Sequence, residues 1–505
     1  MDKKLYNEKI VSQQPAIDLL KKMGYIYISP EQCLKERGSK YNVILKDILR
    51  QQLIKINSYT FANKENKFSL NNIEKAINDL DVPLIEGLVR TSEKIYDYLL
   101  YGKSYLENIG DGKNLSFNLK YIDWDNFENN IFHITEEFSV EIQNENNIIN
   151  KKEDFEIEPK NKYKTARPDI VLFINGIPFG VIECKAPYVS VEQGIEQTIR
   201  NQKNEYIPQL FKFTQILMAT NKNNVKYATC GTPKKFWSVW KEQDNNFLNT
   251  NLENYIKDRE PTTQDKNIIA LFSKERVKNI IKYFVLYDAN IKKICRYQQF
   301  FAINEVIKNI NKSKNNNIYE GGFIWHTQGS GKSLTMVMLT KYILMEMTSI
   351  KPRVIIVTDR KNLDRQISTT FAHTGLKPAN ATTSKNLIEL IEKNRADIIT
   401  TIINKFDTVE KSNVKIDCKN IFILIDESHR SNYGGLSTKM RTVFPNACYI
   451  GFTGTPLLKK QKTSNRFGKL IHKYTIKDGV DDNTIVPLIY EGRTVLQDVD
   501  EKNID

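Results

Sequence analysis

A glycine-rich loop between an apolar run and a helical pattern is the strongest chemical signal in the chain. Residues 326–333 read HTQGSGKS and follow the apolar run 323–325, although His326 stands where the strict pattern has its first glycine. The two glycines of GSGKS allow backbone N–H groups to face the phosphates of a nucleotide at a helix N-terminus. Lys332 can then reach the β and γ phosphates, and the hydroxyl of Ser333 can bind Mg²⁺. The candidate nucleotide ligands are Thr327, Gly329, Ser330, Gly331, Lys332 and Ser333.

An acidic pair after a later apolar run supplies groups for the other half of such a site. The run 421–425 is followed by Asp426 and Glu427. In a parallel sheet, the carboxyl ends of the strands are where metal and water chemistry takes place. Asp426 is therefore predicted to bind Mg²⁺, and Glu427 to activate the attacking water. After the next apolar run, Thr453 and Thr455 of the sequence TGTP form a hydroxyl-rich loop that could sense the nucleotide.

A predicted β-hairpin carries a second constellation, made of two carboxylates and a lysine. Asn175-Gly176 separates two apolar runs, which is the strongest short-range signal for a hairpin. Asp169 precedes the first run, and Glu183 and Lys185 follow the second run two residues apart, so they share one face of a strand. Two carboxylates can hold Mg²⁺ against a scissile phosphate, and a lysine beside them can orient the attacking water. This arrangement could serve a nuclease, and a surface hairpin without catalytic function is the alternative that the pattern alone leaves open.

The turn of this hairpin decides whether the two carboxylates meet. A two-residue loop would pair Ile174 with Ile177 and set Asp169 opposite Ile182, on the wrong face. A three-residue loop with a G1 bulge would set Asp169 opposite Glu183. We therefore predict the bulged turn, or an equivalent one-residue irregularity in this hairpin.

Apolar runs alternate with helical stretches in the second half of the chain. The predicted strands are 323–325, 354–357, 398–402, 421–425 and 449–452. This alternation indicates an α/β fold with a doubly wound parallel sheet. The polar, proline-containing stretch 258–264 marks a predicted boundary between a domain at 1–260 and a domain at 261–505. Amphipathic patterns predict helices over 10–23 and 43–56.

Composition fits a multidomain protein of the cytoplasm. A chain of 505 residues exceeds the usual size of one domain, and its net charge of +14 permits a nucleic-acid partner without establishing one. The six cysteines lie far apart and the five histidines show no metal-ligand spacing, which indicates a reducing compartment and no structural zinc. No run approaches the ~18 apolar residues of a membrane span, so no membrane partner is predicted. Polar runs at 144–152 and 309–317 are predicted surface loops.

In their order along the chain, HTQGSGKS, DESH and TGTP resemble motifs I, II and III of superfamily 2 helicases and translocases. The stretch 296–299 (RYQQ) is similar to the family's adenine-reading segment, which implies a base contact for Gln299. The stretches 359–366 (DRKNLDRQ) and 400–406 (TTIINKF) are similar to its DNA-contacting motifs. The coupling residues implied by the resemblance are His429, Thr453 and Thr455. The sequences DRKNLDRQ, DESHRSNYG and GFTGTP closely resemble motifs of the R subunit (HsdR) of type I restriction enzymes.

That resemblance implies a PD-(D/E)xK nuclease domain with a mixed sheet, followed by the first RecA-like lobe of a translocase with its parallel sheet and phosphate loop. The nuclease signature is Pro168-Asp169 with Glu183-Cys184-Lys185. Residues 202–206 (QKNEY) resemble the QxxxY motif of RecB-type nucleases, which implies that Gln202 and Tyr206 share a helix face and steer the DNA. Glu8 resembles the acid of the opening helix in that class, and a solvated surface glutamate is the alternative.

The resemblance implies a restriction subunit that cleaves double-stranded DNA after ATP-dependent translocation. ATP and Mg²⁺ are the implied cofactors, and the methyltransferase (M) and specificity (S) subunits are the implied partners. Because the chain ends soon after TGTP, the second RecA-like lobe and the helical tail are expected to be absent, and ATP hydrolysis to be deficient. Two alternatives remain open: a non-catalytic fragment that binds DNA and partners, and a superfamily 2 helicase fused to a nuclease of another system.

Overall fold

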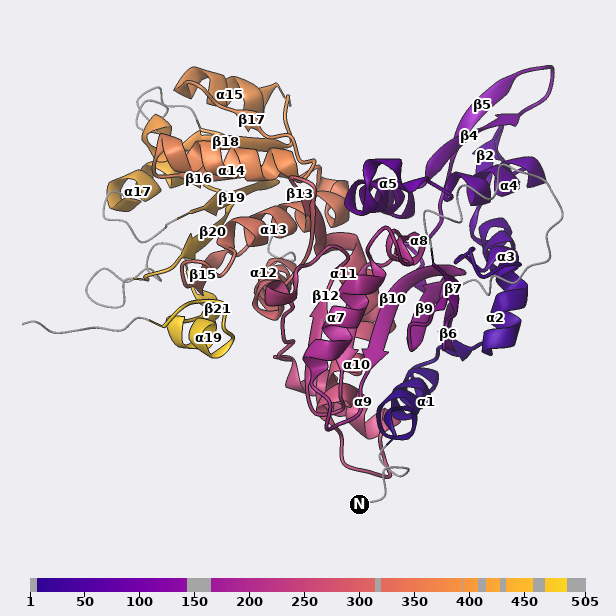
Figure 1. The fold of residues 1–505 in the computed structure, drawn as a ribbon. Helices are drawn as coiled ribbons and strands as arrows, with labels where there is room; N and C mark the ends of the chain where they lie inside the picture. Colours follow the sequence, from indigo (N-terminus) through magenta and orange to yellow (C-terminus); the bar gives the residue numbers. More distant parts are fainter. Residues whose placement is uncertain are drawn as a thin grey trace, which may run out of the picture.

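The computed structural model describes residues 7–142, 165–313, 319–393, 395–406, 415–426, 433–456 and 468–487. Two β-sheets form its framework, a mixed sheet of six strands and a parallel sheet of seven strands. In Figure 1 they occupy different parts of the molecule, and the parallel sheet is built from the later, orange to yellow part of the chain. The predicted α/β architecture is confirmed.

The mixed sheet places the hairpin of the first candidate site at its centre. Its strands lie in the order β1 (Ile26–Tyr27), β6 (Phe132–Glu136), β9 (Ile170–Ile174), β10 (Ile177–Cys184), β11 (Ile216–Thr220) and β12 (Val225–Ala228). β9 is antiparallel to both of its neighbours, whereas β10 runs parallel to β11. Every residue of β9 and β10 is buried, as expected for central strands covered by helices. The helices in contact with this sheet include α1 (Gln14–Lys22), α7 (Val191–Asn201) and α10 (Thr263–Phe272).

Smaller elements extend from this body. They are η1 (Lys9–Gln13), α2 (Pro30–Arg37), α3 (Lys46–Ile56), α4 (Leu70–Asp79), α5 (Leu88–Tyr101), the hairpin β4 (Lys103–Asn108) and β5 (Asn114–Leu119), α8 (Pro208–Phe211) and α9 (Asn245–Tyr255). The two predicted amphipathic helices are confirmed, the first as π-helical η1 continued by α1 and the second as α3. Among the described helices, none combines the length and the apolar character that crossing a bilayer requires.

The parallel sheet brings the nucleotide motifs to one edge. Its strands lie in the order β17 (Ala379–Asn380), β18 (Ile398–Ile402), β16 (Arg353–Thr358), β19 (Ile421–Ile425), β20 (Cys448–Thr453), β15 (Gly322–His326) and β21 (Leu470–Tyr474). All neighbouring pairs are parallel, and the five predicted strands are confirmed. Because the strands are parallel, the segments that follow β15, β19 and β20 emerge at the same edge.

Helices of this lobe include α12 (Tyr297–Ser313), α13 (Lys332–Glu346), α14 (Lys361–His373), α15 (Ser384–Glu392), α17 (Tyr433–Val443) and α19 (Ile476–Asp481). The loop predicted at 309–317 is wrong in its first part, because α12 continues to Ser313. The loop predicted at 144–152 lies outside the described residues.

The two sheets are joined by α10, α11 (Lys274–Tyr283) and the hairpin β13 (Val285–Asp288) and β14 (Ile291–Ile294). Gln264 of α10 donates to the carbonyl of Ser12 at 2.9 Å, which ties this helix to the N-terminal segment. On the other side, Lys341 of α13 donates to the hydroxyl of Tyr96 at 2.7 Å. One buried apolar cluster includes residues from both sheets. The domain boundary near residue 260 stays a prediction, because the elements after it contact both bodies.

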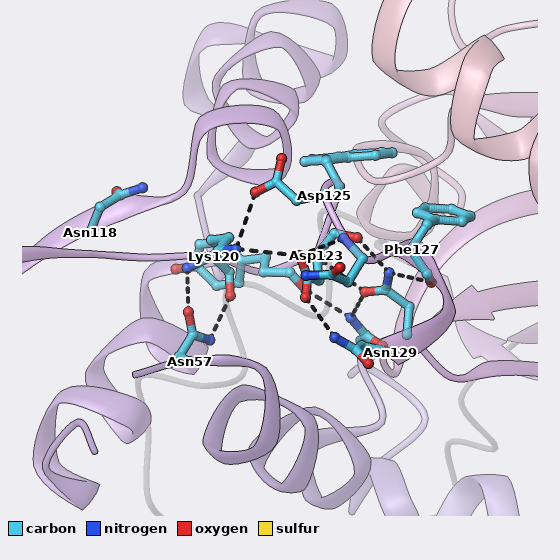
Figure 2. Close-up of polar contacts among 12 residues, drawn as sticks. Asn57, Asn118, Lys120, Asp123, Asp125, Phe127 and Asn129 are labelled. Carbon is cyan, nitrogen blue, oxygen red and sulfur yellow. Dashed lines mark hydrogen bonds and ion pairs between the residues drawn. The ribbon is translucent and has the colours of Figure 1, made fainter. Parts of the chain in front are cut away.

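A polar network fixes the loop that precedes β6 (Figure 2). The carboxylate of Asp123 accepts from Asn129 at 3.0 Å and from Lys120 at 3.3 Å. The backbone N–H of Asp123 donates to Asn130 Oδ1 at 2.9 Å, and this oxygen also accepts from Asn175 Nδ2 at 2.7 Å. The network therefore reaches the turn of the β9–β10 hairpin, where Asn175 is fully buried.

Candidate active sites

The turn of the β9–β10 hairpin differs from the predicted one. Asn175 and Gly176 have φ of 50° and 83°, and Ile174 pairs with Ile177, so the turn has two residues. Two successive residues with positive φ are typical of a type I′ turn, whose twist matches that of the flanking strands. The predicted three-residue turn is therefore wrong.

The one-residue irregularity predicted as the equivalent solution is confirmed inside β10. The register shifts between Pro178 and Gly180, which leaves Phe179 as an extra residue in the strand. Beyond this bulge Ile182 pairs with Ile170. The next residues outward, Asp169 and Glu183, therefore come to face each other.

The predicted nuclease residues lie together at the end of this hairpin. Asp169 Oδ2 accepts from the backbone N–H of Cys184 at 2.7 Å. Lys185 Nζ donates to Glu183 Oε1 at 2.7 Å and to the carbonyl of Cys184 at 2.9 Å. Glu8 reaches the same place, with Oε1 4.0 Å from Lys185 Nζ. Asp169, Glu183 and Lys185 are each at most 9% exposed, so these three side chains form a buried cluster.

Burial controls the electrostatics of this cluster. It raises the pKa of Asp169 to about 6, against the opposing influence of Lys185 and the Cys184 N–H group. The pKa of Glu183 rises to about 8, first because the side chain is buried and then because Asp169 is close. Burial by itself would lower the pKa of Lys185, but Glu183 outweighs it and the pKa is raised. A carboxylate pair beside a protonated lysine is thus held where its negative charge is poorly solvated.

The donor set fits a hard divalent cation. Asp169 and Glu183 offer carboxylate oxygens, and the carbonyl of Cys184 is a third oxygen at the same place. Mg²⁺ commonly uses one or two carboxylates and completes its shell with water and substrate phosphates. Across the described ranges, no group of three or more His, Cys, Asp and Glu side chains could hold a metal ion, so the nuclease pair would supply only two such ligands.

The two accessory residues Gln202 and Tyr206 do not share a helix face, and that prediction is wrong. α7 ends at Asn201, and the chain then turns. Gln202 is buried, and its Oε1 accepts from the backbone N–H of Gly231 at 2.7 Å. Tyr206 lies in the turn, where the Arg200 guanidinium is 5.3 Å from its ring. Gln202 therefore fixes a neighbouring loop, while Tyr206 remains a candidate for DNA contact.

Two residues near the nuclease cluster escaped the sequence analysis. Gln13 donates from Nε2 to the carbonyl of Asp169 at 3.3 Å and to Glu136 at 3.4 Å, and nothing in its sequence context marks it. Gly194 in α7 lies over the site, where an added Cβ would be in van der Waals contact with Glu183 Cγ at 3.4 Å. A glycine inside an amphipathic helix was a usable signal, since such a residue often permits close packing.

The phosphate loop has the geometry expected of it. It links β15 to α13, and Gly329 and Gly331 have φ of 82° and 91°, which glycine adopts without strain. The Ser330 hydroxyl donates to the carbonyl of Thr327 at 2.6 Å, and Lys332 Nζ donates to the carbonyl of His326 at 3.4 Å. Ser333 follows in the first turn of α13.

Gln299 lies against this loop. Its Oε1 accepts from the backbone N–H of Arg296 at 2.9 Å, and its Nε2 donates to the carbonyl of Gly331 at 3.2 Å. A Cβ at position 331 would lie only 2.7 Å from Gln299 Nε2, so this contact also requires glycine. The adenine contact implied for Gln299 stays a prediction, and the structure adds a support role beside the phosphates.

The acidic and TGTP motifs flank the loop. Asp426 directly follows β19 and is 8% exposed, and its backbone N–H donates to Val357 at 3.0 Å. Trp325 Nε1 donates to the carbonyl of Gly454 at 3.1 Å, which brings the TGTP loop beside the phosphate loop. Within TGTP, the N–H of Thr455 donates to Thr453 Oγ1 at 3.1 Å. The predicted residues Glu427 and His429 lie outside the described residues.

A groove of about 640 Å³ lies on the same lobe, between α14, β17 and the end of β18. It combines residues from the two stretches that resemble DNA-contacting motifs, 359–366 and 400–406. Asp364 in this lining is buried and accepts from Asn380 at 2.6 Å, so it serves the local structure. The basic residues of the groove are Lys361, Arg365, Lys377 and Lys405.

Known proteins resemble both parts of the chain. Residues 5–236 match the family described as type I restriction enzyme R protein N terminus, and residues 298–505 match the SWI2/SNF2 ATPase family. An endonuclease subunit named for the type I restriction enzyme MjaIXP of Methanocaldococcus jannaschii is 30% identical over 524 residues, 97% of this chain and 46% of that protein. The type I restriction enzyme HindI endonuclease subunit of Haemophilus influenzae is 30% identical over 354 residues, 64% of this chain and 33% of that protein.

A solved fragment of an HsdR subunit from Vibrio vulnificus YJ016 is 18% identical and covers 69% of this chain and 56% of that chain. Its TM-score of 0.28 is too low to support a conclusion about the fold.

The hairpin, the phosphate loop and the sequence matches together define two parts of the chain. The first is an N-terminal domain of the kind found in R proteins of type I restriction enzymes, and the second is an ATPase lobe of the SWI2/SNF2 kind. The chain spans about half the length, 46%, of the first of these curated relatives. It belongs to the R subunit (HsdR) family of type I restriction enzymes.

Proposed function

We propose that this chain carries the nuclease and the nucleotide-binding half of the motor in a type I restriction enzyme that cleaves double-stranded DNA after ATP-dependent translocation. One observation carries the proposal. Asp169, Glu183 and Lys185 meet at one hairpin, in a chain whose other sheet presents a phosphate loop. The relatives named as endonuclease subunits of type I restriction enzymes support the same reading.

On the nuclease side, Asp169 and Glu183 would hold Mg²⁺, with the carbonyl of Cys184 as a further oxygen. When bound, the ion would polarise the scissile phosphate. The Lys185 ammonium, which Glu183 keeps protonated, would orient the attacking water and offset the charge that develops on the phosphate. Gln13 and the Cys184 N–H group hold the backbone and the carboxylate of Asp169 in place.

On the motor side, the backbone N–H groups of the glycine-rich loop would donate hydrogen bonds to the phosphates. Lys332 would exchange the carbonyl of His326, which it contacts at 3.4 Å, for a phosphate oxygen. Ser333 and Asp426 would hold the Mg²⁺ that accompanies ATP, and Glu427 would activate water. The deficiency in ATP hydrolysis expected of this chain stays a prediction.

The basic groove of the motor lobe would contact the DNA backbone. Its four cationic side chains can pair with phosphates, which gives affinity without reading the base sequence. Base-specific recognition would then belong to the S subunit, with the M subunit as the other partner.

Single substitutions in the assembled enzyme test the assignment. Asp169→Ala and Lys185→Ala should abolish DNA cleavage and spare ATP hydrolysis, whereas Lys332→Ala should stop translocation. Lys64→Ala, at an exposed position of β3 (Lys64–Asn66), is the matched control and should change neither activity. Normal cleavage by Asp169→Ala would show that the nuclease site has been assigned to the wrong residues.

A further inference from the structure

A chain of hydrogen bonds joins the phosphate loop to a segment on the nuclease side of the molecule. His326, at the start of the loop, has its Nε2 2.9 Å from Nδ1 of His472 in β21. Nε2 of His472 lies 2.7 Å from Oε1 of Gln243, in the segment between β12 and α9. His326 is completely buried, and His472 is 9% exposed. Three side chains far apart in the sequence thus form one path out of the nucleotide site.

The donors and acceptors along this path fix the positions of the ring protons. Oε1 of Gln243 can only accept, so His472 carries its proton on Nε2 and leaves Nδ1 to accept from Nε2–H of His326. Both rings are neutral, because burial lowers the pKa of His472 to about 4 and that of His326 well below its ordinary value. Every bond therefore donates in one direction, from the loop toward Gln243.

The same segment is tied to the motor lobe at a second point. Lys241 forms an ion pair with Asp482, whose carboxylate also accepts from Tyr297 at 2.6 Å and from Tyr474 at 2.9 Å. Tyr297 is the first residue of α12, and the carbonyl of Tyr474 accepts from the backbone N–H of Thr327 at 2.9 Å. The segment thus supports the elements on both sides of the phosphate loop.

We propose that Gln243 and His472 are positioning residues of the nucleotide site, through which filling of the phosphate loop and packing of the nuclease-side segment influence each other. Lys332 contacts the carbonyl of His326, the residue whose ring begins the path. A bound phosphate that draws Lys332 away changes the environment of His326, and the change passes to His472 and Gln243. Because coupling between two sites is reciprocal, packing of the Gln243 segment also favours the conformation of the phosphate loop that binds nucleotide. The inference rests on the proposed nucleotide-binding function.

The histidine path depends on the residue that begins the phosphate loop. A glycine at position 326, as in the strict loop pattern, would have no ring and could not begin it. The residue that departs from the strict pattern is therefore the one whose buried imidazole contacts His472.

Histidine ring spectra test the path directly, because the chain has only five histidines. In the ¹⁵N-histidine-labelled chain, long-range ¹H–¹⁵N spectra should show the Nε2–H tautomer for His326 and His472. Both signals should shift when MgATP is added, while those of His133 and His373 should stay in place. Binding of a fluorescent ATP analogue, measured separately, reports whether the loop takes nucleotide. Binding without any shift of the His472 ring would overturn the path and leave the proposed function standing.

Affinity measurements on variants supply the second test. Gln243→Ala should raise the dissociation constant of the ATP analogue by about two- to tenfold, and Gln243→Glu, which keeps an acceptor, should restore binding. Gln209→Ala is the control, since Gln209 is another glutamine of the nuclease body that forms a long-range hydrogen bond, donating to the Glu141 carbonyl at 2.8 Å; it is buried, whereas Gln243 is exposed. Unchanged affinity in Gln243→Ala would overturn the inference. If the wild-type chain bound no analogue, the proposed nucleotide site and this inference would fail together.

A double-mutant cycle separates the path from a general loss of structure. Gln243→Ala and His472→Phe should show effects on nucleotide affinity that do not add, because both break the same path. The unfolding midpoint of each variant without nucleotide controls for folding. Additive effects would contradict a shared path.

Discussion

Removing the charge of Asp169 should stabilise the metal-free protein while it abolishes cleavage. Burial raises the pKa of this carboxyl from 3.8 to about 6. A group whose pKa is higher in the folded state favours folding when it is protonated, so its contribution is complete below pH 3.8 and is lost as pH rises through about 6. At 1.36 kcal/mol per pKa unit, ionisation of Asp169 lowers the free energy of unfolding of the wild-type chain by about 3 kcal/mol by pH 8.

Asp169→Asn keeps an acceptor for the Cys184 N–H group, 2.7 Å away in the wild-type chain, but carries no charge. Its free energy of unfolding in EDTA should exceed that of the wild type by about 3 kcal/mol at pH 8, and by much less at pH 4. Urea unfolding at both pH values measures the difference, and Asp125→Asn at an exposed position is the control. Added Mg²⁺ should stabilise the wild type and not the variant. A variant less stable than the wild type at pH 8, or equally stabilised at both pH values, would refute the reasoning.

Three further predictions concern the turn, the groove and the loop after α7. Gly176→Ala should lower the free energy of unfolding by about 1–3 kcal/mol, because φ is 83° and the new Cβ would lie 2.6 Å from a backbone oxygen. Gly112→Ala, which has open space around its Cβ, is the control and should lower the free energy of unfolding by less in the same urea titration. Arg365→Ala should weaken DNA binding equally for all sequences and reduce the slope of log K against log salt by about 0.9; a sequence-dependent loss would contradict a backbone contact. Gln202→Ala should speed amide exchange at Gly231, whose N–H loses its acceptor, and unchanged exchange would show that this hydrogen bond does not hold the loop.

The hairpin shows which part of a site the local sequence determines. Asn175-Gly176 was sufficient to predict a turn, and the spacing of the acidic residues was sufficient to require one extra residue between them. A residue from outside the hairpin lies against the strand at that position. Gly180 follows the bulge, and a Cβ there would lie 3.1 Å from the ring of Phe272 in α10. Since α10 is distant in the sequence, the hairpin pattern alone could not choose between the turn and the strand.

Helix ends set a similar limit. A spacing of four residues places Gln202 and Tyr206 on one face only while the helix continues, and α7 ends at Asn201. The side chain of Gln202 then takes a partner, Gly231, from a segment well beyond the helix. Neither the helix end nor the partner is encoded in the five residues of the motif.

Strands of the motor lobe were predictable where they were continuous apolar runs next to recognisable motifs. β21 was missed because its buried and exposed residues are mixed and it lies at the edge of the sheet. As a result, the contact between His326 and His472 could not be anticipated, because it exists only through the pairing of β15 with β21.

The bulge in β10 also restricts which length changes the nuclease can survive during evolution or engineering. Because successive residues of a strand point to opposite sides, inserting or deleting one residue between Asp169 and Glu183 would turn one carboxylate away from the other. A compensating single-residue change elsewhere in the same interval would restore activity. Natural variants of this hairpin should therefore differ in length by even numbers, or carry their bulge at another position.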